Sequence, residues 1–376
     1  MTMRRVLVTG GAGFIGSHLV AALRARGHRV RVLDVLDPQV HGRDGRHRGT
    51  PEDVEMLRGD ILDEELLGRA LEGIEVLFHQ AASVGVGQSM YEAAAYTRVN
   101  SLGTALLMQR LAAPGSKVEK VVVASSMSLY GEGYYSCPSC GPVHPQPRSR
   151  RSLSPGEWEP ACPRCKAPLE PLPTAETVPP APTSIYAITK RCQEETVLVM
   201  GRAYGIPAVA LRYFNVYGPG QALSNPYTGV AAIFASRLLN GAAPILFEDG
   251  MQSRDFIHVS DIVRANLLAM EKPQADGEVF NVGTGRRTTL LEMASSLAAK
   301  LRPQGDAAPQ VAGTFREGDI RHCFADVTKI GKALGFEAAM PLERGYEDLA
   351  EWARTQKPQD FTREAVAELE ARGLVS

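Results

Sequence analysis

The first 126 residues alternate short apolar runs with amphipathic stretches. Runs rich in β-branched residues predict buried strands at 5–10, 28–34, 75–82 and 120–126. Between them, apolar residues at helical spacing predict helices over 14–26 and 96–111. Strands that are apolar on both faces and alternate with helices indicate a parallel sheet covered on both sides. We therefore expect an α/β fold with a doubly wound parallel sheet of the Rossmann type.

The pattern changes after residue 130. Residues 131–182 are rich in proline, hold four cysteines and show little periodicity, which predicts a loop-rich insertion. The alternation then resumes with a helix expected over 184–203 and a strand over 207–214, followed by short strands and helices at 230–240, 260–271 and 289–301. We expect three parts: a sheet domain (1–130 and 183–212), the insertion (131–182), and a smaller lobe formed mainly by 213–376 and interleaved with the sheet domain.

The composition limits the partners. The 376 residues carry a formal net charge of −1. Nucleic acids and anionic membranes bind positively charged surfaces, so neither is expected as the main partner. No apolar run reaches the roughly 18 residues that a membrane-spanning helix needs. Glycines also interrupt the apolar stretch near the N-terminus, which argues against a signal peptide. We therefore expect a cytoplasmic protein.

A glycine-rich turn lies between the first strand and the first helix. Gly10 permits the tight turn, Gly13 lets a pyrophosphate approach the backbone, and Gly16 lets the helix pack closely on the strand. Asp34 ends the second strand 18 residues after Gly16, where a carboxylate accepts hydrogen bonds from ribose hydroxyls and repels a 2′-phosphate. This pattern predicts NAD rather than NADP. Three arginines could offset the repulsion, but we interpret them as solvated loop charges: Arg43, Arg46 and Arg48.

A tyrosine and a lysine stand four residues apart at the start of the helix expected over 184–203. At this spacing Tyr186 and Lys190 share one helix face. A free tyrosine, with a pKa near 10, is a poor base at neutral pH, but a nearby ammonium and a nicotinamide cation both favour the phenolate. On its own the pair is more often an accident of a surface helix.

The pair does not stand alone. Five segments occur in order along the chain: TGGAGFIG, HQAA, ASSMSLYG, YAITK and RYFNVYGPGQ. This set closely resembles the extended short-chain dehydrogenase/reductase family, specifically its nucleotide-sugar epimerases and dehydratases, over nearly the whole chain except 131–182. The resemblance implies that Tyr186 is the catalytic acid/base and that Lys190 binds the nicotinamide ribose and lowers the pKa of the tyrosine. It also implies that Ser126 forms a hydrogen bond to the reacting oxygen.

The same resemblance implies further contacts. For the cofactor, besides the glycine turn, Asp34, Tyr186 and Lys190, these are Phe14, Ile15, Asp60, Ile61, Gln80, Ala81, Ala82 and Asn100. For the nucleotide and diphosphate of the substrate they are Asn215, Arg254, Arg316 and Asp319, with Ser126 at the sugar. Arginine suits the diphosphate because its planar fork pairs two phosphate oxygens at once.

The reaction implied is epimerisation at carbon 4 of the sugar. Tyr186 takes the proton of the 4-hydroxyl while hydride passes to NAD; the 4-keto sugar rotates, and hydride returns to its other face. Dehydratases of the family carry an acidic pair directly after the catalytic threonine, whereas Met127 and Ser128 stand here, so dehydration is not expected. Decarboxylation of a UDP-uronic acid remains an alternative. A non-catalytic, NAD-sensing regulator is disfavoured because Ser126, Tyr186 and Lys190 are all intact.

The sugar is indicated by resemblance alone. Val84 stands where UDP-galactose 4-epimerases commonly have a lysine. The segments CPSCGPVHP and ALSNPYTGV are similar to sequences described as dTDP-L-rhamnose 4-epimerases. We therefore expect a dTDP-6-deoxyhexose such as dTDP-L-rhamnose, with UDP-hexoses and UDP-uronic acids as alternatives. The family resemblance also implies a homodimer packed through helices around 96–111 and 184–203.

The insertion carries two C-x-x-C pairs, Cys137/Cys140 and Cys162/Cys165, separated by 21 residues. This spacing is close to that of four-cysteine zinc sites, and four thiolates leave no open position for catalysis, so we predict structural zinc. A rubredoxin-like iron site, free thiols and disulfides are the alternatives. The insertion interrupts the chain between Ser126 and Tyr186, so we expect it to emerge beside the active site. The other two cysteines are interpreted as packed thiols: Cys192 and Cys323.

Overall fold

The computed structural model describes residues 2–42, 53–153, 156–304 and 307–375. Within them, seven parallel strands form the central sheet. Their order across the sheet is β3 (Glu55–Arg58), β2 (Arg29–Asp34), β1 (Arg5–Thr9), β4 (Val76–His79), β5 (Lys120–Ser126), β9 (Ala208–Tyr213) and β14 (Val279–Val282). The strand order reverses direction beside β1, so the sheet is doubly wound. The predicted Rossmann-type fold is confirmed.

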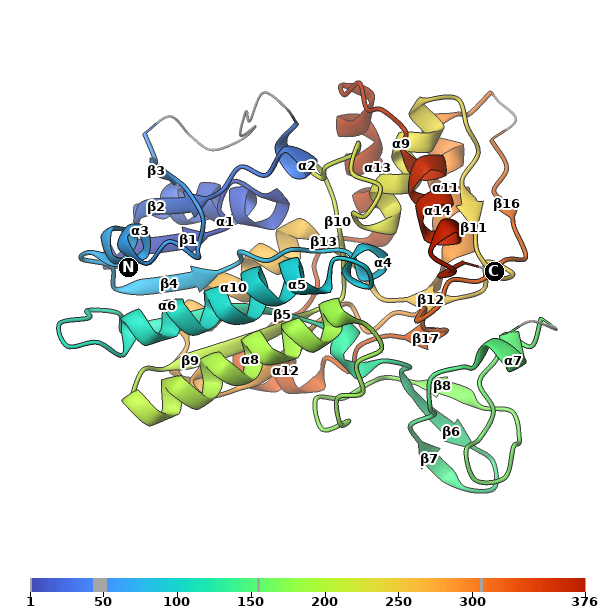
Figure 1. The fold of residues 1–376 in the computed structure, drawn as a ribbon, viewed down its shortest axis with the longest axis horizontal. Coiled ribbons are helices and arrows are strands. Elements are labelled where there is room, and N and C mark those ends of the chain that lie inside the picture. Colours follow the sequence, from blue (N-terminus) through green and yellow to red (C-terminus); the bar gives the residue numbers. More distant parts are fainter. Residues whose placement is uncertain (1, 43–52, 154–155, 305–306, 376) are drawn as a thin grey trace.

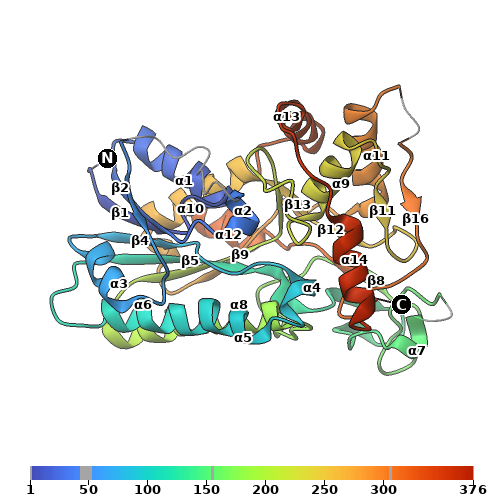
Figure 2. The same ribbon diagram turned by 45° about the horizontal axis from the view of Figure 1, so that its top comes forward.

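Helices cover both faces of this sheet (Figure 2). One face carries α1 (Phe14–Ala25), α10 (Val259–Glu271) and α12 (Thr328–Leu334). The other carries α3 (Glu64–Leu71), α6 (Gly103–Leu111) and α8 (Ile185–Tyr204). In β1, Val6 and Val8 belong to the first apolar core and Leu7 to the second. Since successive side chains of a strand point to opposite faces, burial on both sides explains why these strands are continuous apolar runs.

The helix expected over 96–111 is less regular than the spacing of its apolar residues predicts. It consists of α5 (Ala93–Tyr96), a π-helical turn η1 (Thr97–Leu102) and α6. Short helical segments elsewhere are α2 (Pro38–His41), α4 (Val86–Ser89), η2 (Met127–Tyr130) and η3 (Pro273–Ala275). A π-helical turn is rare and often occurs at functional sites, and the period of apolar residues does not reveal it. Asn100 lies within this turn.

The smaller lobe has an apolar core of its own. Three helices build most of it: α9 (Val230–Leu239), α11 (Leu290–Leu301) and α13 (Leu342–Arg354). Short strands pair as β10 (Asn215–Tyr217) with β13 (Phe256–His258), β11 (Ile245–Leu246) with β16 (Gln310–Val311), and β12 (Ser253–Arg254) with both β15 (Thr288–Thr289) and β17 (His322–Cys323). The chain returns from this lobe to the large sheet at α10, β14 and α12, so the two parts are interleaved.

The insertion forms a small antiparallel sheet of order β7-β6-β8, where β6 is Tyr134–Cys137, β7 is Gly141–Val143 and β8 is Glu170–Leu172. It also contains the single-turn helix α7 (Arg150–Leu153). Figure 1 shows it projecting from the body of the molecule below β12 and β17, with the C-terminal helix α14 (Thr362–Ala371) above it. In the described residues, no helix is long and apolar enough to cross a membrane.

Candidate active site

The glycine turn forms a cradle at the N-terminus of α1. Gly10 has a φ of +69°, and a Cβ on it would lie 2.7 Å from the backbone nitrogen of Ala81. A Cβ on Gly16 would lie 2.1 Å from the carbonyl oxygen of Gly10, so both positions require glycine. At Gly13 a Cβ would approach only the Gly10 carbonyl oxygen, at 3.3 Å, which leaves that side of the turn open. The helix has no side-chain cap and no acidic residue in its first turn, which suits a bound anion.

Asp34 lies beside this turn at the end of β2. Its Oδ2 accepts a hydrogen bond from the backbone N–H of Ala12 at 3.0 Å, and its Oδ1 accepts one from Leu36 at 2.9 Å. The buried carboxylate is therefore held in place by backbone groups on both sides. An open pyrophosphate cradle followed by a fixed carboxylate fits NAD. The three arginines interpreted as solvated loop charges lie outside the described residues: Arg43, Arg46 and Arg48.

The loop after β3 lies next to the π-helical turn. The Oδ1 of Asp60 accepts the backbone N–H of Leu62 at 2.9 Å, which fixes the loop in a tight turn. Ile61 is buried, and a Cβ on Gly103 would lie 2.8 Å from its Cγ2. The sequence-predicted adenine contacts Asp60 and Ile61 thus belong to one rigid loop.

Gln80 turns its side chain away from the glycine turn. Its Nε2 donates to the Tyr213 hydroxyl at 3.1 Å and to Oδ1 of Asn266 at 3.3 Å. The part of this segment that borders the glycine turn is the backbone, since the nearest atoms to a Cβ on Gly10 belong to Gln80 and Ala81. Any contact of residues 80–82 with a cofactor would therefore involve main-chain atoms.

Asn100, in the π-helical turn, links the loop after β4 to helix α8. Its Oδ1 accepts the backbone N–H of Ser83 at 2.7 Å, and its Nδ2 donates to the Ser83 carbonyl at 3.0 Å and to Oγ1 of Thr189 at 2.9 Å. The side chain is completely buried. Asn100 therefore fixes the loop after β4 against helix α8, and its hydrogen-bonding capacity is largely used for that purpose.

Tyr186 and Ser126 meet where β5 ends and α8 begins. The helix is capped by Ser184, whose Oγ accepts the backbone N–H of Ala187 at 3.2 Å. The Ser126 side chain lies close enough to the Tyr186 phenol to influence its pKa. Burial raises the pKa of Tyr186, and the polar interaction with Ser126 partly opposes this rise. Ser128 donates its hydroxyl to Oγ of Ser126 at 2.9 Å, which orients the Ser126 side chain.

Lys190 lies one turn further along the same helix and is buried. Its Nζ donates to Oε1 of Gln193 at 2.7 Å. The Gln193 amide in turn donates to Oγ1 of Thr104 at 2.9 Å and lies 3.0 Å from Nε2 of His79. Burial lowers the pKa of Lys190 to about 7, although the Glu194 carboxylate opposes this. Because this pKa is close to neutral pH, a small change in the surroundings of Lys190 can change its protonation state.

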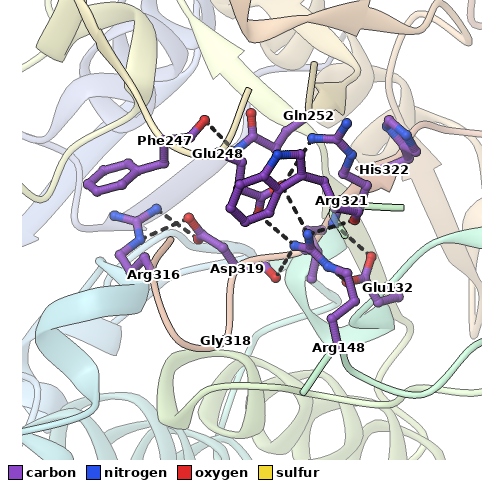
Figure 3. Close-up of polar contacts among 12 residues, drawn as sticks. Glu132, Arg148, Phe247, Glu248, Gln252, Arg316, Gly318, Asp319, Arg321 and His322 are labelled. Carbon is purple, nitrogen blue, oxygen red and sulfur yellow. Dashed lines mark hydrogen bonds and ion pairs between the residues drawn. The ribbon is translucent and has the colours of Figure 1, made fainter. Parts of the chain in front are cut away.

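Two arginines of the smaller lobe lie close to one chain segment. Arg254 donates to the carbonyls of Ile320 at 2.6 Å and Arg321 at 3.0 Å. Arg316 forms a two-pronged pair with Asp319, with N–O distances of 3.0 and 2.8 Å (Figure 3). Asp319 raises the pKa of Arg316, so this arginine stays charged. The structure thus brings three of the four predicted nucleotide and diphosphate contacts into one cluster.

Asn215, the fourth predicted substrate contact, lies on β10. Its backbone N–H donates to the carbonyl of Asp255 at 2.9 Å. Its buried Oδ1 has no hydrogen-bond partner among the described residues. A buried acceptor without a partner costs free energy, so this oxygen is suited to accept a hydrogen bond from a ligand.

Three side chains that form hydrogen bonds with predicted site residues were not themselves predicted from the sequence. They are Ser128, Thr189 and Gln193. Gln193 follows Lys190 by three residues and so shares its helix face, which is a signal that the sequence contains. In the sequence, Ser128 is notable only as a position where the dehydratases of the family carry an acidic residue. Thr189 gave no signal, because its partner Asn100 is 89 residues away.

Comparison with known proteins decides the family. Residues 6–154 and 162–283 match the NAD dependent epimerase/dehydratase family. The chain belongs to this family. It is 36% identical to the dTDP-L-rhamnose 4-epimerase of Burkholderia thailandensis over 93% of this chain and 94% of that protein. The resemblance seen in the sequence motifs is therefore confirmed.

Solved structures of the epimerase/dehydratase family share the fold. The UDP-glucose 4-epimerase of Thermotoga maritima with UDP-glucose has a TM-score of 0.75 and 34% identity, covering 93% of this chain and 99% of that one. The UDP-glucose 4-epimerase of Thermus thermophilus in complex with NAD has a TM-score of 0.74 and 32% identity, covering 94% of this chain and 100% of that one. Both similarities extend over the sheet domain and the smaller lobe.

The four cysteines of the insertion form a compact cluster. The sulfur atoms of Cys137, Cys140, Cys162 and Cys165 all lie within 4.8 Å of one another. Tetrahedral thiolates at a Zn–S distance of about 2.3 Å would lie about 3.8 Å apart, so the cluster has the right size for zinc. The residue after each pair has left-handed backbone, with φ of +70° at Gly141 and +64° at Lys166. The two pairs therefore end in similar turns.

Backbone groups also favour a thiolate in this cluster. The N–H groups of Cys165 and Arg164 lower the pKa of Cys162 to about 6, whereas the contact with Cys165 raises the pKa of Cys140. His144 is turned elsewhere: its Nε2 lies 2.9 Å from the carbonyl oxygen of Tyr130 and 2.7 Å from that of Glu132. The donor set of the cluster is thus four sulfurs, which suits a structural metal ion.

Proposed function

We propose that the protein is an NAD-dependent nucleotide-sugar 4-epimerase. The observation that carries the proposal is the arrangement of Ser126, Tyr186 and Lys190 beside the glycine turn. The Ser126 side chain lies close enough to Tyr186 to lower its pKa, and Lys190 is linked through Gln193 to the Ala81 segment that packs on Gly10. A base, its orienting serine and a buried lysine are thus brought together at the predicted dinucleotide site.

The chain supplies the acid–base chemistry. Ser126 would form a hydrogen bond to the sugar 4-oxygen, and Tyr186 would take and later return the proton of the 4-hydroxyl. Lys190 would bind the nicotinamide ribose and, when charged, favour the Tyr186 phenolate. NAD, when bound, supplies the hydride acceptor and donor. Gly10, Gly13 and Gly16 would hold its pyrophosphate, and the Asp34 carboxylate its adenine ribose.

Epimerisation is favoured over dehydration. Elimination of water needs an acid and a base near carbons 5 and 6 of the sugar. The positions after Ser126 hold Met127, whose side chain is buried, and Ser128, whose hydroxyl is engaged by Ser126. Neither provides a carboxyl group there.

For the substrate we propose a dTDP-6-deoxyhexose such as dTDP-L-rhamnose. The 36% identity to a dTDP-L-rhamnose 4-epimerase over 93% of the chain supports this. A UDP-hexose is the second candidate, supported by the two UDP-glucose 4-epimerase structures. In either case Asn215, Arg254, Arg316 and Asp319 would contact the nucleotide and diphosphate, with Arg316 exchanging part of its pairing with Asp319 for phosphate oxygens.

The test is a panel of dTDP-, UDP- and GDP-sugars incubated with the purified protein, with products identified by NMR. We expect the carbon-4 epimer, and the highest kcat/KM for dTDP-L-rhamnose. Preference for UDP-glucose would move the assignment to the second candidate. A 4-keto-6-deoxy product or release of carbon dioxide would contradict epimerisation.

Three further features belong to this proposal. Zinc in the four-cysteine cluster would be structural. The protein would act in the cytoplasm, where NAD and nucleotide sugars are made. Two copies would pair through the helical segments 96–111 and 184–203, because large apolar side chains are exposed on η1 and α8: Leu102 (47%), Ile188 (49%) and Val199 (60%).

A further inference from the structure

The insertion and the smaller lobe meet in a buried cluster of four charged side chains (Figure 3). Glu132 and Arg148 come from the insertion, and Glu248 and Arg321 from the lobe. Arg148 pairs with Glu132 at 3.0 Å and with Glu248 at 2.9 Å, while Arg321 pairs with Glu248 at 3.0 Å. The exposed fractions of all four side chains are between 1% and 3%.

The four buried charges balance, and Arg321 pairs in addition with two carboxylates that are more exposed, Glu159 of the insertion and Asp249 of the lobe. Removing charges from water is costly, and the cost is offset only when the geometry of the pairs is good. The cluster therefore holds the two parts of the chain in one relative position, because a displacement would separate the buried Arg148 from Glu248.

Glu248 carries a second sign of constraint. Its φ is +53°, in the left-handed region that residues with a Cβ rarely adopt. Such strain persists only where the surroundings determine the conformation. Here the carboxylate contacts an arginine from each part of the chain, Arg148 and Arg321. A glutamate thus stands at position 248 although glycine would relieve the backbone strain there.

The cluster holds a short segment, residues 319–321, from one side. Arg148 donates its Nη2 to the carbonyl of Asp319 at 2.9 Å. Glu132 accepts the backbone N–H of Arg321 at 2.7 Å. Both contacts come from the insertion, so the insertion fixes the two ends of this segment.

The same segment positions the two arginines of the substrate site. Arg254 donates to the carbonyls of Ile320 and Arg321, and the Asp319 carboxylate pairs with Arg316. Residues 319–321 therefore lie between the insertion on one side and the guanidinium groups of Arg254 and Arg316 on the other. A shift of the insertion would move both guanidinium groups.

We propose that Arg148 and Glu132 are positioning residues for the nucleotide-diphosphate site. They touch neither the sugar nor the cofactor; they act by fixing residues 319–321 and, through them, Arg254 and Arg316. The identity of the ligand, a nucleoside diphosphate, rests on the proposed function. The insertion thereby determines the affinity for the nucleotide. NAD retention and the arrangement of Ser126, Tyr186 and Lys190 do not depend on Arg148 or Glu132.

The first test is Arg148→Lys, which keeps the charge balance of the cluster but loses the planar fork that reaches Asp319, Glu132 and Glu248 together. The dissociation constants of dTDP and UDP are measured by calorimetry on the NAD-containing enzyme. Loss of one charge-assisted contact predicts roughly a tenfold weaker Kd for the nucleotide that the wild type binds. KM should rise similarly, with kcat within about twofold and NAD content unchanged. The exposed Arg151, changed to lysine, is the matched control.

A second variant guards against misfolding. Arg148→Met combined with Glu248→Gly removes one charge of each sign and relieves the left-handed backbone at residue 248. It should weaken nucleotide binding more than Arg148→Lys does. Unchanged Kd values in both variants, or a wild type that binds neither dTDP nor UDP, would overturn the inference. A wild type that binds nucleotide but epimerises no sugar would instead contradict the proposed function and leave the positioning role standing.

Discussion

Tyr186 is the single residue on which the proposed chemistry depends most. Tyr186→Phe keeps the ring and its packing but removes the ionisable oxygen, so kcat should fall by roughly 10²–10⁴, the usual contribution of a general acid/base. Binding of dTDP and NAD should persist. Tyr204→Phe, at the exposed end of the same helix, is the control. Turnover near that of the wild type in Tyr186→Phe would mean that another group acts as the base.

His79 predicts a pH dependence of stability. Burial lowers its pKa from 6.5 to about 3. As the pH falls below 6.5, the unfolded chain takes up a proton that the folded chain refuses until about pH 3, so stability decreases with falling pH over this window. The loss is about 1.4 kcal/mol per pH unit, or roughly 2 kcal/mol at pH 5. In urea unfolding at pH 7.5 and pH 5, His79→Gln should lose less stability than the wild type; parallel losses would refute this.

The residues whose structural role follows from the sequence are those with a local physical signature. Gly16 is required by its close contact with Gly10 in the same turn, Gly10 by its left-handed backbone, and Asp34 by its place at a strand end. The orientations of Gln80 and Asn100 were not accessible, because their partners come from distant segments. Asn100 bonds to Thr189, 89 residues away, and Gln80 bonds to Tyr213, 133 residues away.

Among the elements of the fold, the insertion gives the sharpest prediction. If its four cysteines hold one metal ion, elemental analysis should find about one zinc per chain. Metal binding contributes folding energy to a segment with a small core. Cys162→Ser should therefore expose residues 132–182 to limited proteolysis and raise KM more than it lowers NAD content.

Cys192→Ser, on helix α8 outside the cluster, is the control for this change. Iron in place of zinc would identify the rubredoxin-like alternative. Absence of any metal, or equal proteolysis of Cys162→Ser and the wild type, would contradict a structural metal site.

Element prediction succeeded where burial sets a clear period. The strands of the large sheet are buried on both faces and are therefore apolar throughout. The strands β6, β7 and β8 escaped notice because they span only three or four residues in a proline-rich segment. The π-helical turn in residues 97–102 was hidden because one irregular turn barely disturbs the apolar spacing.

At the scale of the whole molecule, the exposed apolar side chains of η1 and α8 predict a dimer. Val199→Glu would place a carboxylate from each copy at a desolvated interface, so the molar mass by light scattering should fall from two chains to one. Val311→Glu, an equally exposed apolar position on β16 in the smaller lobe, should leave the dimer intact. A wild type of single-chain mass would contradict the pairing.

The arrangement of the parts was only partly predictable. Interleaving of the lobe with the sheet follows from chain order, because strands and helices alternate again after residue 207. The junction between insertion and lobe does not follow from the sequence. Arg148 and Glu248 are 100 residues apart, and isolated charges in a sequence are indistinguishable from solvated ones until the fold brings them together.

The most direct test of the central claim follows the hydrogen on carbon 4 of the sugar. The best nucleotide sugar from the panel, carrying deuterium at that carbon, is incubated in ordinary water with the purified enzyme and no added reductant. Epimerisation by internal return of hydride predicts a carbon-4 epimer that keeps its deuterium at carbon 4. In a second incubation, of unlabelled sugar in D₂O, no deuterium should enter at carbons 5 and 6. Loss of the label to water, or a strict need for added NADPH, would contradict the account.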